Sequence, residues 1–414
     1  MNVTQLQKVD RWLGIPLCFV LTCIRRSLPE PRQNPKPPLR SILFVKLAEQ
    51  GSTVLAYAAI REAIETVGAE NVYFIVFDDN RLILDVMGVL PPDNVLTISF
   101  KTLRSMISSA WRSLRRLRGL NVDAALDLEF FSRGSAALTF LSGARRRVGF
   151  HPFFGAGPYR GNLMTHRLVY NPHLHTSQTF HSIVQAAKLD ASSLPTMNLR
   201  PCSPGELPPL FRPDADETST VQRLLSEELG FCPSLVLLNP NASDLIPLRR
   251  WPIDRYVQLA RRLLAKYEQL RVAFTGAPSE INVAGSLAAQ VGSDRCVSLA
   301  GKTTLRQLLV LFTMADVLVT NDSGPAHFAA LTPIRVVTLF GPETPALYRA
   351  CSPNNVALWA GLVCSPCVSA YNNRQSLCTN NVCMQSLFVD RVFAEVCNAY
   401  EAQLRERISR SVRE

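Results

Sequence analysis

Short apolar runs alternate with helical segments along most of this 414-residue chain, and this alternation constrains the fold more than any other feature. The first set begins at Ser41 and reads, in order, SILFVKL, NVYFIVF, NVLTISF, DAALDLE, RRVGF and RLVY, with helical pieces between the runs. GSTVLAYAAIREAIETVG has helical spacing and ends in Gly68, a typical stop. Strands that are apolar throughout and separated by helices predict a parallel sheet covered on both faces.

A proline-rich stretch at 200–217 interrupts this pattern, which then resumes. The second set contains SLVLLNP, LRVAFTG, CVSLAG, DVLVTND and RVVTLFG, again with helical segments between them. We therefore predict two doubly wound, Rossmann-like α/β domains at 41–205 and 218–414, joined by a linker at 206–217 and facing a central cleft. Ligands of such domains bind at the carboxyl ends of the strands.

Residues 1–40 form a separate segment, an apolar run followed by a proline-rich linker. The uncharged run from Trp12 to Ile24 is shorter than the about 20 residues that a spanning helix needs, and Pro16 interrupts it. Arg25 and Arg26 follow directly. We favour a segment that lies at a membrane surface. A helix packed on the protein and a signal peptide stay as alternatives.

The formal net charge of +11 suits an anionic membrane, a phosphate-rich ligand or nucleic acid, and is also found in merely soluble basic proteins. No zinc finger, basic zipper or aromatic single-strand platform is evident, so we exclude nucleic acid as a partner. The basic segment at 104–120 has apolar residues at Ile107, Trp111, Leu114 and Leu117. It predicts either a core-facing helix with a solvated basic face or a contact with anionic lipid or a phosphorylated acceptor.

Two loops that follow strands of the second domain carry groups suited to a nucleotide. In NPNASDLIPLRRWP, the backbone at Asn241 and Ser243 and the Ser243 hydroxyl can donate to a phosphate, with Arg249 or Arg250 supplying charge. TGAPSE places Glu280 at the start of a helix. There it either accepts from ribose hydroxyls or simply favours the helix N-terminus.

The loop in LVTNDSGPAHFAAL is the third. Asp322 lies just past a strand, Ser323 and Gly324 can expose backbone N–H groups, and His327 falls in the first turn of a helix predicted at 326–331. The positive end of that helix suits a diphosphate. The alternative is that Asp322 or Ser323 only caps the helix and His327 is structural. A further strand ends in FGPETP, which should lie beside this loop.

VTNDSGPAHFAA followed by VVTLFGPETP resembles the signature of glycosyltransferase family 9, the heptosyltransferase family of inverting GT-B enzymes. NPNAS…RRWP and GAPSE stand in the family's order and spacing. The resemblance implies a donor domain that binds a nucleotide-diphosphate sugar, with no other cofactor and no catalytic metal. Its matching positions are Ser243 and Arg249 for the diphosphate, Glu280 for the ribose, and Asp322, Ser323, Gly324 and His327 for the sugar diphosphate.

The same resemblance implies transfer of a sugar, such as a heptose, to a lipopolysaccharide-type or other cell-envelope glycan acceptor. With 11 scattered cysteines, an odd number unlike a disulfide framework, we place the chain in the reducing cytoplasm. The lipid-linked acceptor implies a peripheral position on the inner face of the membrane.

The family's catalytic base is usually an Asp directly after a Gly, but VKLAEQGSTVLA has Ser52 in that place. A serine without a partner is no general base near neutral pH. Glu49 is our first replacement, and Asp127 or Glu129 the second. Helix capping by Ser52 and a solvated Glu49 are the plain alternatives. The departure leaves open an impaired GT-B protein that binds a nucleotide sugar as a scaffold and, less favoured, a sugar-nucleotide epimerase.

Two further motifs suggest other chemistry. AGKTTL lacks the first glycine of a phosphate-binding P-loop, because Cys296 stands there, and a P-loop ATPase is excluded. Cys364, Cys367, Cys378 and Cys383 have a C-x2-C-x10-C-x4-C spacing compatible with tetrahedral zinc. Disulfides and free thiols are the alternatives for these four residues.

Overall fold

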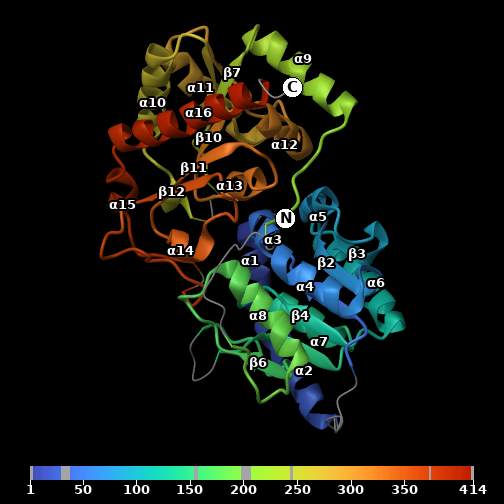
Figure 1. Cartoon of the computed structure of the whole chain (residues 1–414). Coiled ribbons are helices and arrows are strands. Elements are labelled where there is room, and N and C mark those ends of the chain that lie inside the picture. The colour runs from blue at the N-terminus through green and yellow to red at the C-terminus, as the bar shows by residue number, and fades with distance from the viewer. Residues whose placement is uncertain are drawn as a thin grey trace. The chain divides into compact units, whose positions relative to one another are not determined.

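The computed structural model divides into two compact units, each with its own sheet (Figure 1). Unit 1 is Met1–Leu207 together with Ser369–Gln375, and unit 2 is Pro208–Val368 together with Ser376–Glu414. The structure describes residues 3–28, 38–152, 157–196, 207–242, 246–372 and 374–411.

Unit 1 is built on a six-stranded sheet in the order β3-β2-β1-β4-β5-β6, and all of its pairings are parallel. Its central strands are buried along their whole length, which explains why their sequences are apolar throughout. The strands are β1 (Ile42–Val45), β2 (Val72–Phe77), β3 (Val95–Ile98), β4 (Ala124–Asp127), β5 (Arg146–Phe150) and β6 (His166–Leu168).

Helices connect the strands of unit 1, and α8 follows the last strand. They are α3 (Gln50–Leu55), α4 (Tyr57–Val67), α5 (Arg81–Met87), α6 (Leu103–Leu120), α7 (Arg133–Leu141) and α8 (Thr176–Lys188). The one helix expected from GSTVLAYAAIREAIETVG is two, α3 and α4, which meet at Ala56, and α4 ends at Gly68 with a positive φ of 82°. Helix α6 buries Ser109, Ser113 and Leu117, whereas Ile107 and Trp111 are exposed rather than core-facing.

Two helices precede the sheet of unit 1, α1 (Val3–Trp12) and α2 (Gly14–Ser27). Helix α2 packs against α7, with Cys18 and Leu21 in one apolar cluster with Ala136 and Met164. Pro16 lies in the first turn of α2 and so does not break it. Among the described helices, none has the length and apolar character needed to cross a bilayer.

Unit 2 repeats the architecture with a second parallel sheet, in the order β12-β11-β10-β7-β8-β9. The strands are β7 (Ser234–Asn239), β8 (Leu270–Phe274), β9 (Cys296–Ser298), β10 (Val317–Asn321), β11 (Arg335–Phe340) and β12 (Asn355–Trp359). The two doubly wound domains predicted from the apolar alternation are confirmed as the fold class.

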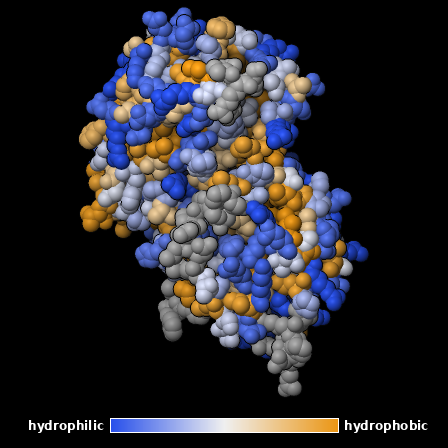
Figure 2. Space-filling view, in the orientation of Figure 1, coloured by the Kyte–Doolittle hydropathy of each residue, from blue (hydrophilic) through white to orange (hydrophobic). Residues whose placement is uncertain are grey.

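The helices of unit 2 are α9 (Ala215–Leu229), α10 (Ile253–Lys266), α11 (Ile281–Val291), α12 (Leu305–Met314), α13 (Gly324–Ala329), α14 (Pro345–Tyr348), α15 (Val382–Gln385) and α16 (Val389–Ser411). Helix α10 packs against α11 and α16, and its buried side joins the main core of this unit. Hydrophilic residues cover much of unit 2 on the face seen in Figure 2, as expected for amphipathic helices around a sheet.

Asp10 fastens the N-terminal helices to the start of α7. Its Oδ1 accepts from the backbone N–H groups of Arg133 (2.9 Å) and Gly134 (2.8 Å), and its Oδ2 pairs with the Arg133 guanidinium. These amides lie in the first turn of α7, where a helix has no carbonyl partners of its own. Asp10 therefore caps a helix that is far away in sequence.

We expect Asp10→Ala to lower the free energy of unfolding of unit 1 by about 1 kcal/mol, because two first-turn amides lose their acceptor. Hydrogen exchange at Arg133 and Gly134 should accelerate. Asp10→Asn keeps an acceptor oxygen and is the matched control. Equal exchange in both variants and the wild type would contradict this capping role.

Candidate functional site

Four loops of unit 2 meet at the carboxyl edge of its sheet. They follow β7, β8, β10 and β11, which are neighbours in the order β11-β10-β7-β8. Because every pairing is parallel, each of these strands ends at the same edge. The three predicted nucleotide loops and the FGPETP segment therefore lie together there.

Arg249 lies in the loop after β7 and contacts the loops after β10 and β11. Its Nη1 donates to the backbone oxygen of Asp322 (3.2 Å), its Nε lies 3.5 Å from Asp322 Oδ2, and its Nη2 pairs with Glu343. Both carboxylates are almost fully buried. Two buried acids thus hold the planar guanidinium in one orientation.

Asn241 and Glu280 approach one another beside Gly276. A Cβ added to Gly276 would lie 2.8 Å from Glu280 Oε2 and 3.0 Å from Asn241 Nδ2, so both side chains lie against this glycine. Glu280 Oε2 accepts from the backbone N–H of Ala277 (2.6 Å), which is the helix-favouring role considered for it. The buried Asn241 Nδ2 has no hydrogen-bond partner among the described residues.

The loop after β10 begins with buried Asp322 and continues through half-buried Ser323 and Gly324 into α13, where His327 is buried. Ser323 is at the N-cap position, but its hydroxyl donates to the Asn321 carbonyl (3.2 Å) and makes no capping bond. Helix α13 spans Gly324–Ala329, starting two residues earlier than predicted and ending two earlier. With six residues, it adds little dipole to the site.

Ser243, the other predicted diphosphate residue, lies outside the described residues.

In unit 1, Asp127 ends β4 and is completely buried. Its Oδ2 pairs with Arg160 and accepts from the Ser135 hydroxyl (3.1 Å), while its Oδ1 accepts from the backbone N–H of Glu129 (3.1 Å). Burial raises the pKa of Asp127 to about 6, and Arg160 is the main group that opposes the rise. Asp127 has no exposed surface, so its burial favours Glu49 over Asp127 as the candidate base.

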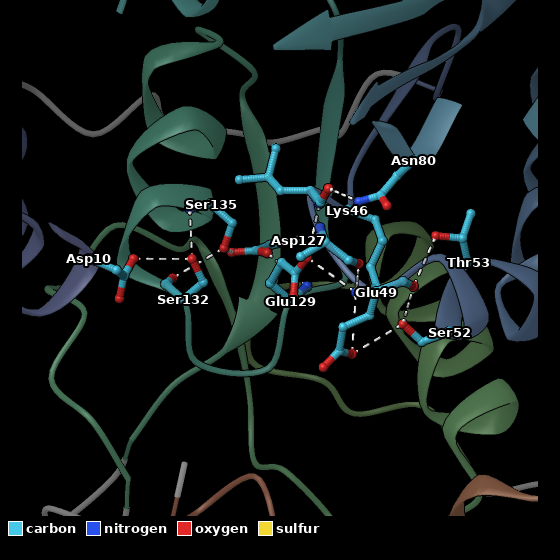
Figure 3. Close-up of polar contacts among 12 residues, drawn as sticks. Asp10, Lys46, Glu49, Ser52, Thr53, Asn80, Asp127, Glu129, Ser132 and Ser135 are labelled. Carbon is cyan, nitrogen blue, oxygen red and sulfur yellow. Dashed lines mark hydrogen bonds and ion pairs between the residues drawn. The ribbon is translucent and has the colours of Figure 1, made fainter. Parts of the chain in front are cut away.

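Arg160 is also buried and binds three strand-end carbonyls besides Asp127. Its Nη1 donates to the backbone oxygens of Phe130 (2.9 Å), Phe150 (3.3 Å) and Glu129 (3.4 Å). The Asp127–Arg160 pair therefore ties the ends of β4 and β5 together. Figure 3 shows how the polar contacts run on from Asp127 through Ser135 and Ser132 to Asp10.

Glu129, the other candidate on this loop, is occupied by the turn that follows β1. Its Oε1 accepts from Lys46 Nζ (3.1 Å) and from the backbone N–H groups of Leu47 (2.9 Å) and Ala48 (2.9 Å). Lys46 itself is buried and also donates to the Ala48 carbonyl (2.6 Å). Glu129 is thus a positioning group for the loop that carries Glu49.

Glu49 lies directly before α3 with a positive φ of 65°, and its side chain is 32% exposed. Its Oε2 accepts from the Ser52 hydroxyl (3.2 Å) and is 3.8 Å from Lys46 Nζ, and its Oε1 pairs with Arg374. Figure 3 shows the Glu49 carboxylate and Ser52 facing each other. Ser52 also donates to the Glu49 carbonyl (2.9 Å), so both predicted residues form one unit.

The four clustered cysteines are free thiols, with Cys364 and Cys378 exposed and Cys383 buried. Across the residues that the structure describes, no group of three or more His, Cys, Asp or Glu side chains is placed to hold a metal ion.

Sequence reasoning missed Lys46, Arg160, Glu343 and Arg374. Lys46 and Glu343 each had a local signal, a charged residue directly after an apolar strand and an acid inside FGPETP. Arg160 and Arg374 had none, because their partners Asp127 and Glu49 are 33 and 325 positions away.

Comparison with protein families matches residues 110–377, well over half of the chain, to glycosyltransferase family 9 (heptosyltransferase). Among curated proteins, lipopolysaccharide heptosyltransferase 2 of Salmonella typhimurium is 32% identical over 120 residues, or 28% of this chain and 32% of that protein. Lipooligosaccharide heptosyltransferase 2 of Haemophilus ducreyi is 29% identical over 160 residues, or 34% and 43%. The matched part of the chain thus covers between about a third and a half of the length of these relatives.

Solved structures extend the likeness to both units, as a likeness of fold. The E. coli ADP-heptose lps heptosyltransferase II has a TM-score of 0.65 at 20% identity, covering 89% of this chain and 99% of that one. A family 9 glycosyltransferase from Veillonella parvula has a TM-score of 0.65 at 17% identity, covering 89% and 97%. E. coli heptosyltransferase WaaC with ADP has a TM-score of 0.59 at 17% identity, covering 87% and 99%.

We predict that Asp127→Asn lowers the free energy of unfolding by about 3–5 kcal/mol, because it leaves the buried Arg160 without its counter-charge. Ser135→Ala removes only a neutral donor to the same carboxylate and should cost about 1 kcal/mol. Urea denaturation followed by circular dichroism measures both. Comparable losses in the two variants would show that the Asp127–Arg160 pair is not what stabilises these strand ends.

Proposed function

Because the chain belongs to glycosyltransferase family 9, we propose that it transfers a sugar from a nucleotide-diphosphate donor to a lipopolysaccharide-type or other cell-envelope glycan. The observation that carries the proposal is that four polar loops lie together at the carboxyl edge of the unit 2 sheet and that Arg249 links three of them. This is the edge at which doubly wound domains bind nucleotides.

Arg249 is the proposed diphosphate ligand. A guanidinium presents several N–H donors in one plane, which matches the geometry of phosphate oxygens. The two buried acids keep the guanidinium in place but offset its charge, so the exposed Arg250 adds the further positive charge that a diphosphate requires. Asp322, Ser323, Gly324 and His327 would surround the sugar diphosphate, as in the family pattern.

Asn241 and Glu280 are proposed to contact the nucleoside. The Asn241 amide is buried without a partner among the described residues, and a donor in this state gains most from a ligand acceptor. Glu280 accepts from the Ala277 amide at the carboxyl edge of the sheet, and its carboxylate is of the type that accepts hydrogen bonds from ribose hydroxyls. The fold is shared with E. coli heptosyltransferase WaaC, which was solved with ADP, and ADP is accordingly our first probe for this chain.

Glu49 is proposed as the general base. It is partly exposed, unlike Asp127, and less heavily engaged by backbone amides than Glu129. Lys46 and Arg374 fix its carboxylate, and Ser52 donates to it from the position where the family usually has its Asp. Glu49 would take the proton of the acceptor hydroxyl as that oxygen attacks the anomeric carbon.

We propose that attack comes from the face opposite the leaving nucleoside diphosphate, which inverts the anomeric centre. The O–C bond to the acceptor forms, the bond from the anomeric carbon to the diphosphate breaks, and Arg249 stabilises the departing negative charge without a metal. The acceptor is a lipid-linked glycan at the cytoplasmic face of the inner membrane, and the protein is peripheral there.

Arg249→Lys should weaken ADP binding about tenfold, because an ammonium group cannot keep the planar contacts of the guanidinium. Isothermal titration calorimetry of the purified chain measures it. Arg295→Lys is the matched control, since Arg295 contacts the carbonyls of Tyr267 and Glu268 away from these loops. Unchanged affinity in Arg249→Lys would remove this residue from the donor site.

Glu49→Gln should lower kcat about 100-fold or more, while the affinity for ADP stays at the wild-type value, because a general base contributes to the reaction and not to donor binding. The acidic limb of the pH–rate profile should also disappear. Glu65→Gln changes a solvated acid on α4 and serves as the control. Ser52→Ala should reduce kcat less than Glu49→Gln, since it removes one hydrogen bond to the base.

The transfer assay also distinguishes this enzyme from the two alternatives that Ser52 motivates, a nucleotide-sugar-binding scaffold and an epimerase. Wild-type protein that binds ADP but transfers no sugar to any glycan acceptor would favour a nucleotide-sugar-binding scaffold. Conversion of the donor without an acceptor would favour an epimerase. A chelator in the same assay should leave transfer unchanged, and its loss would contradict the metal-independent mechanism.

A further inference from the structure

Helix α2 presents an unusually apolar face to solvent. Leu13, which precedes it, and Leu17, Val20 and Ile24 follow one another at helical spacing and are all exposed. Phe19 (60% exposed) and Trp12 (74% exposed) lie next to this stripe. We call the exposed residues Trp12, Leu13, Ile15, Leu17, Phe19, Val20 and Ile24 the α2 patch.

The opposite side of α2 is already used for packing. Cys18 and Leu21 are buried against α7, and the Thr22 hydroxyl accepts from the backbone N–H of Asn162 (2.9 Å). A side chain at Gly161 would meet Thr22 and the Cys18 carbonyl within 2.7 Å. Helix α2 is therefore seated closely on unit 1, and its apolar patch is held outward by the fold.

Positive charge surrounds the α2 patch. Lys8, Arg11 and Arg26 are exposed at its two ends, and α2 itself contains no acidic residue. Asp10, the acid of α1, is turned away from solvent to cap α7. Apolar side chains flanked by cations, with a Trp at the edge, match the boundary between anionic headgroups and acyl chains.

We propose that the α2 patch docks unit 1 on an anionic lipid bilayer, with α2 lying in the interface. The 14 residues of α2 measure about 21 Å, less than the about 30 Å of a hydrocarbon core, and its packed side stays with the protein. A second copy of the chain fits less well. A symmetric dimer would bring the cations at the ends of both patches together, with no acidic residue on α2 to meet them.

This proposal rests on the proposed function. An enzyme bound to the bilayer shares one surface with a lipid-linked acceptor and encounters it by diffusion in that surface. The test is independent of that function, since vesicle binding requires neither donor nor acceptor. Failure of docking would therefore leave transfer to a water-soluble acceptor untouched, and failure of transfer would leave vesicle binding untouched.

The experiment is co-sedimentation of the full chain with vesicles of phosphatidylethanolamine and phosphatidylglycerol, and with vesicles of phosphatidylcholine alone. We expect binding to the anionic vesicles, weakened by salt. Phe19→Glu with Val20→Glu should reduce it about tenfold or more, because two charges would have to enter the acyl region. Arg11→Glu with Arg26→Glu should reduce it through charge alone.

Phe231→Glu is the matched control, because Phe231 is more exposed (79%) than Phe19 (60%) but belongs to unit 2. Thermal denaturation and circular dichroism establish that each variant is folded, which is expected for substitutions at exposed positions. Wild-type binding that is equal on both vesicles, or unchanged in both double variants, would overturn the proposal. So would sedimentation equilibrium showing a wild-type dimer that the Phe19→Glu, Val20→Glu variant dissociates, with no vesicle binding by either.

Discussion

Parallel strand pairing is the constraint on which the rest of both units depends. Parallel strands all run in the same direction, so a crossover must carry the chain back to the start of the next strand. The loops that follow the strands therefore all lie at the carboxyl edge of the sheet. In unit 2 this brings together four loops that are distant in sequence; Arg249 and Glu343, for example, are 94 positions apart. In unit 1 it brings the loop after β1 beside the loop after β4, where Lys46 meets Glu129. Side-chain chemistry at both edges follows from backbone topology.

Buried ion pairs then hold these loops together at the edge of each sheet. Arg160 with Asp127 and Arg249 with Glu343 each place a guanidinium on a carboxylate that has almost no exposure. Their partners differ, however. Arg160 donates to the backbone carbonyls of Glu129, Phe130 and Phe150 and so has a structural role, whereas Arg249 links loops at the carboxyl edge of its sheet. The same type of pair thus serves structure in unit 1 and, by our proposal, donor binding in unit 2.

The sequence predicts much of this because strands and loops leave local signals. Uniformly apolar runs indicate buried parallel strands, and the polar tips that follow them indicate the loops that hold Asn241, Arg249 and Asp322. Three features had no local signal. The break between α3 and α4 occurs at an alanine, an ordinary helix former. The burial of Asp127 depends on Arg160, and the fixed carboxylate of Glu49 depends on Arg374; both arginines are brought in by tertiary structure. The resemblance to a family indicates which loops bind the donor, but it does not predict the ion pairs of Asp127 with Arg160 and of Glu49 with Arg374.

The replacement of the usual Asp by Ser52 becomes easier to understand from the contacts of Glu49. Glu49 has a left-handed backbone conformation at the start of α3, which costs free energy for a residue with a side chain. That conformation accompanies a carboxylate between Lys46, Ser52 and Arg374, three residues before the expected position of the base. A serine at position 52 can donate to this carboxylate, whereas an aspartate there would repel it. By our proposal, Ser52 and Glu49 thus form one compensated arrangement in place of the usual Asp.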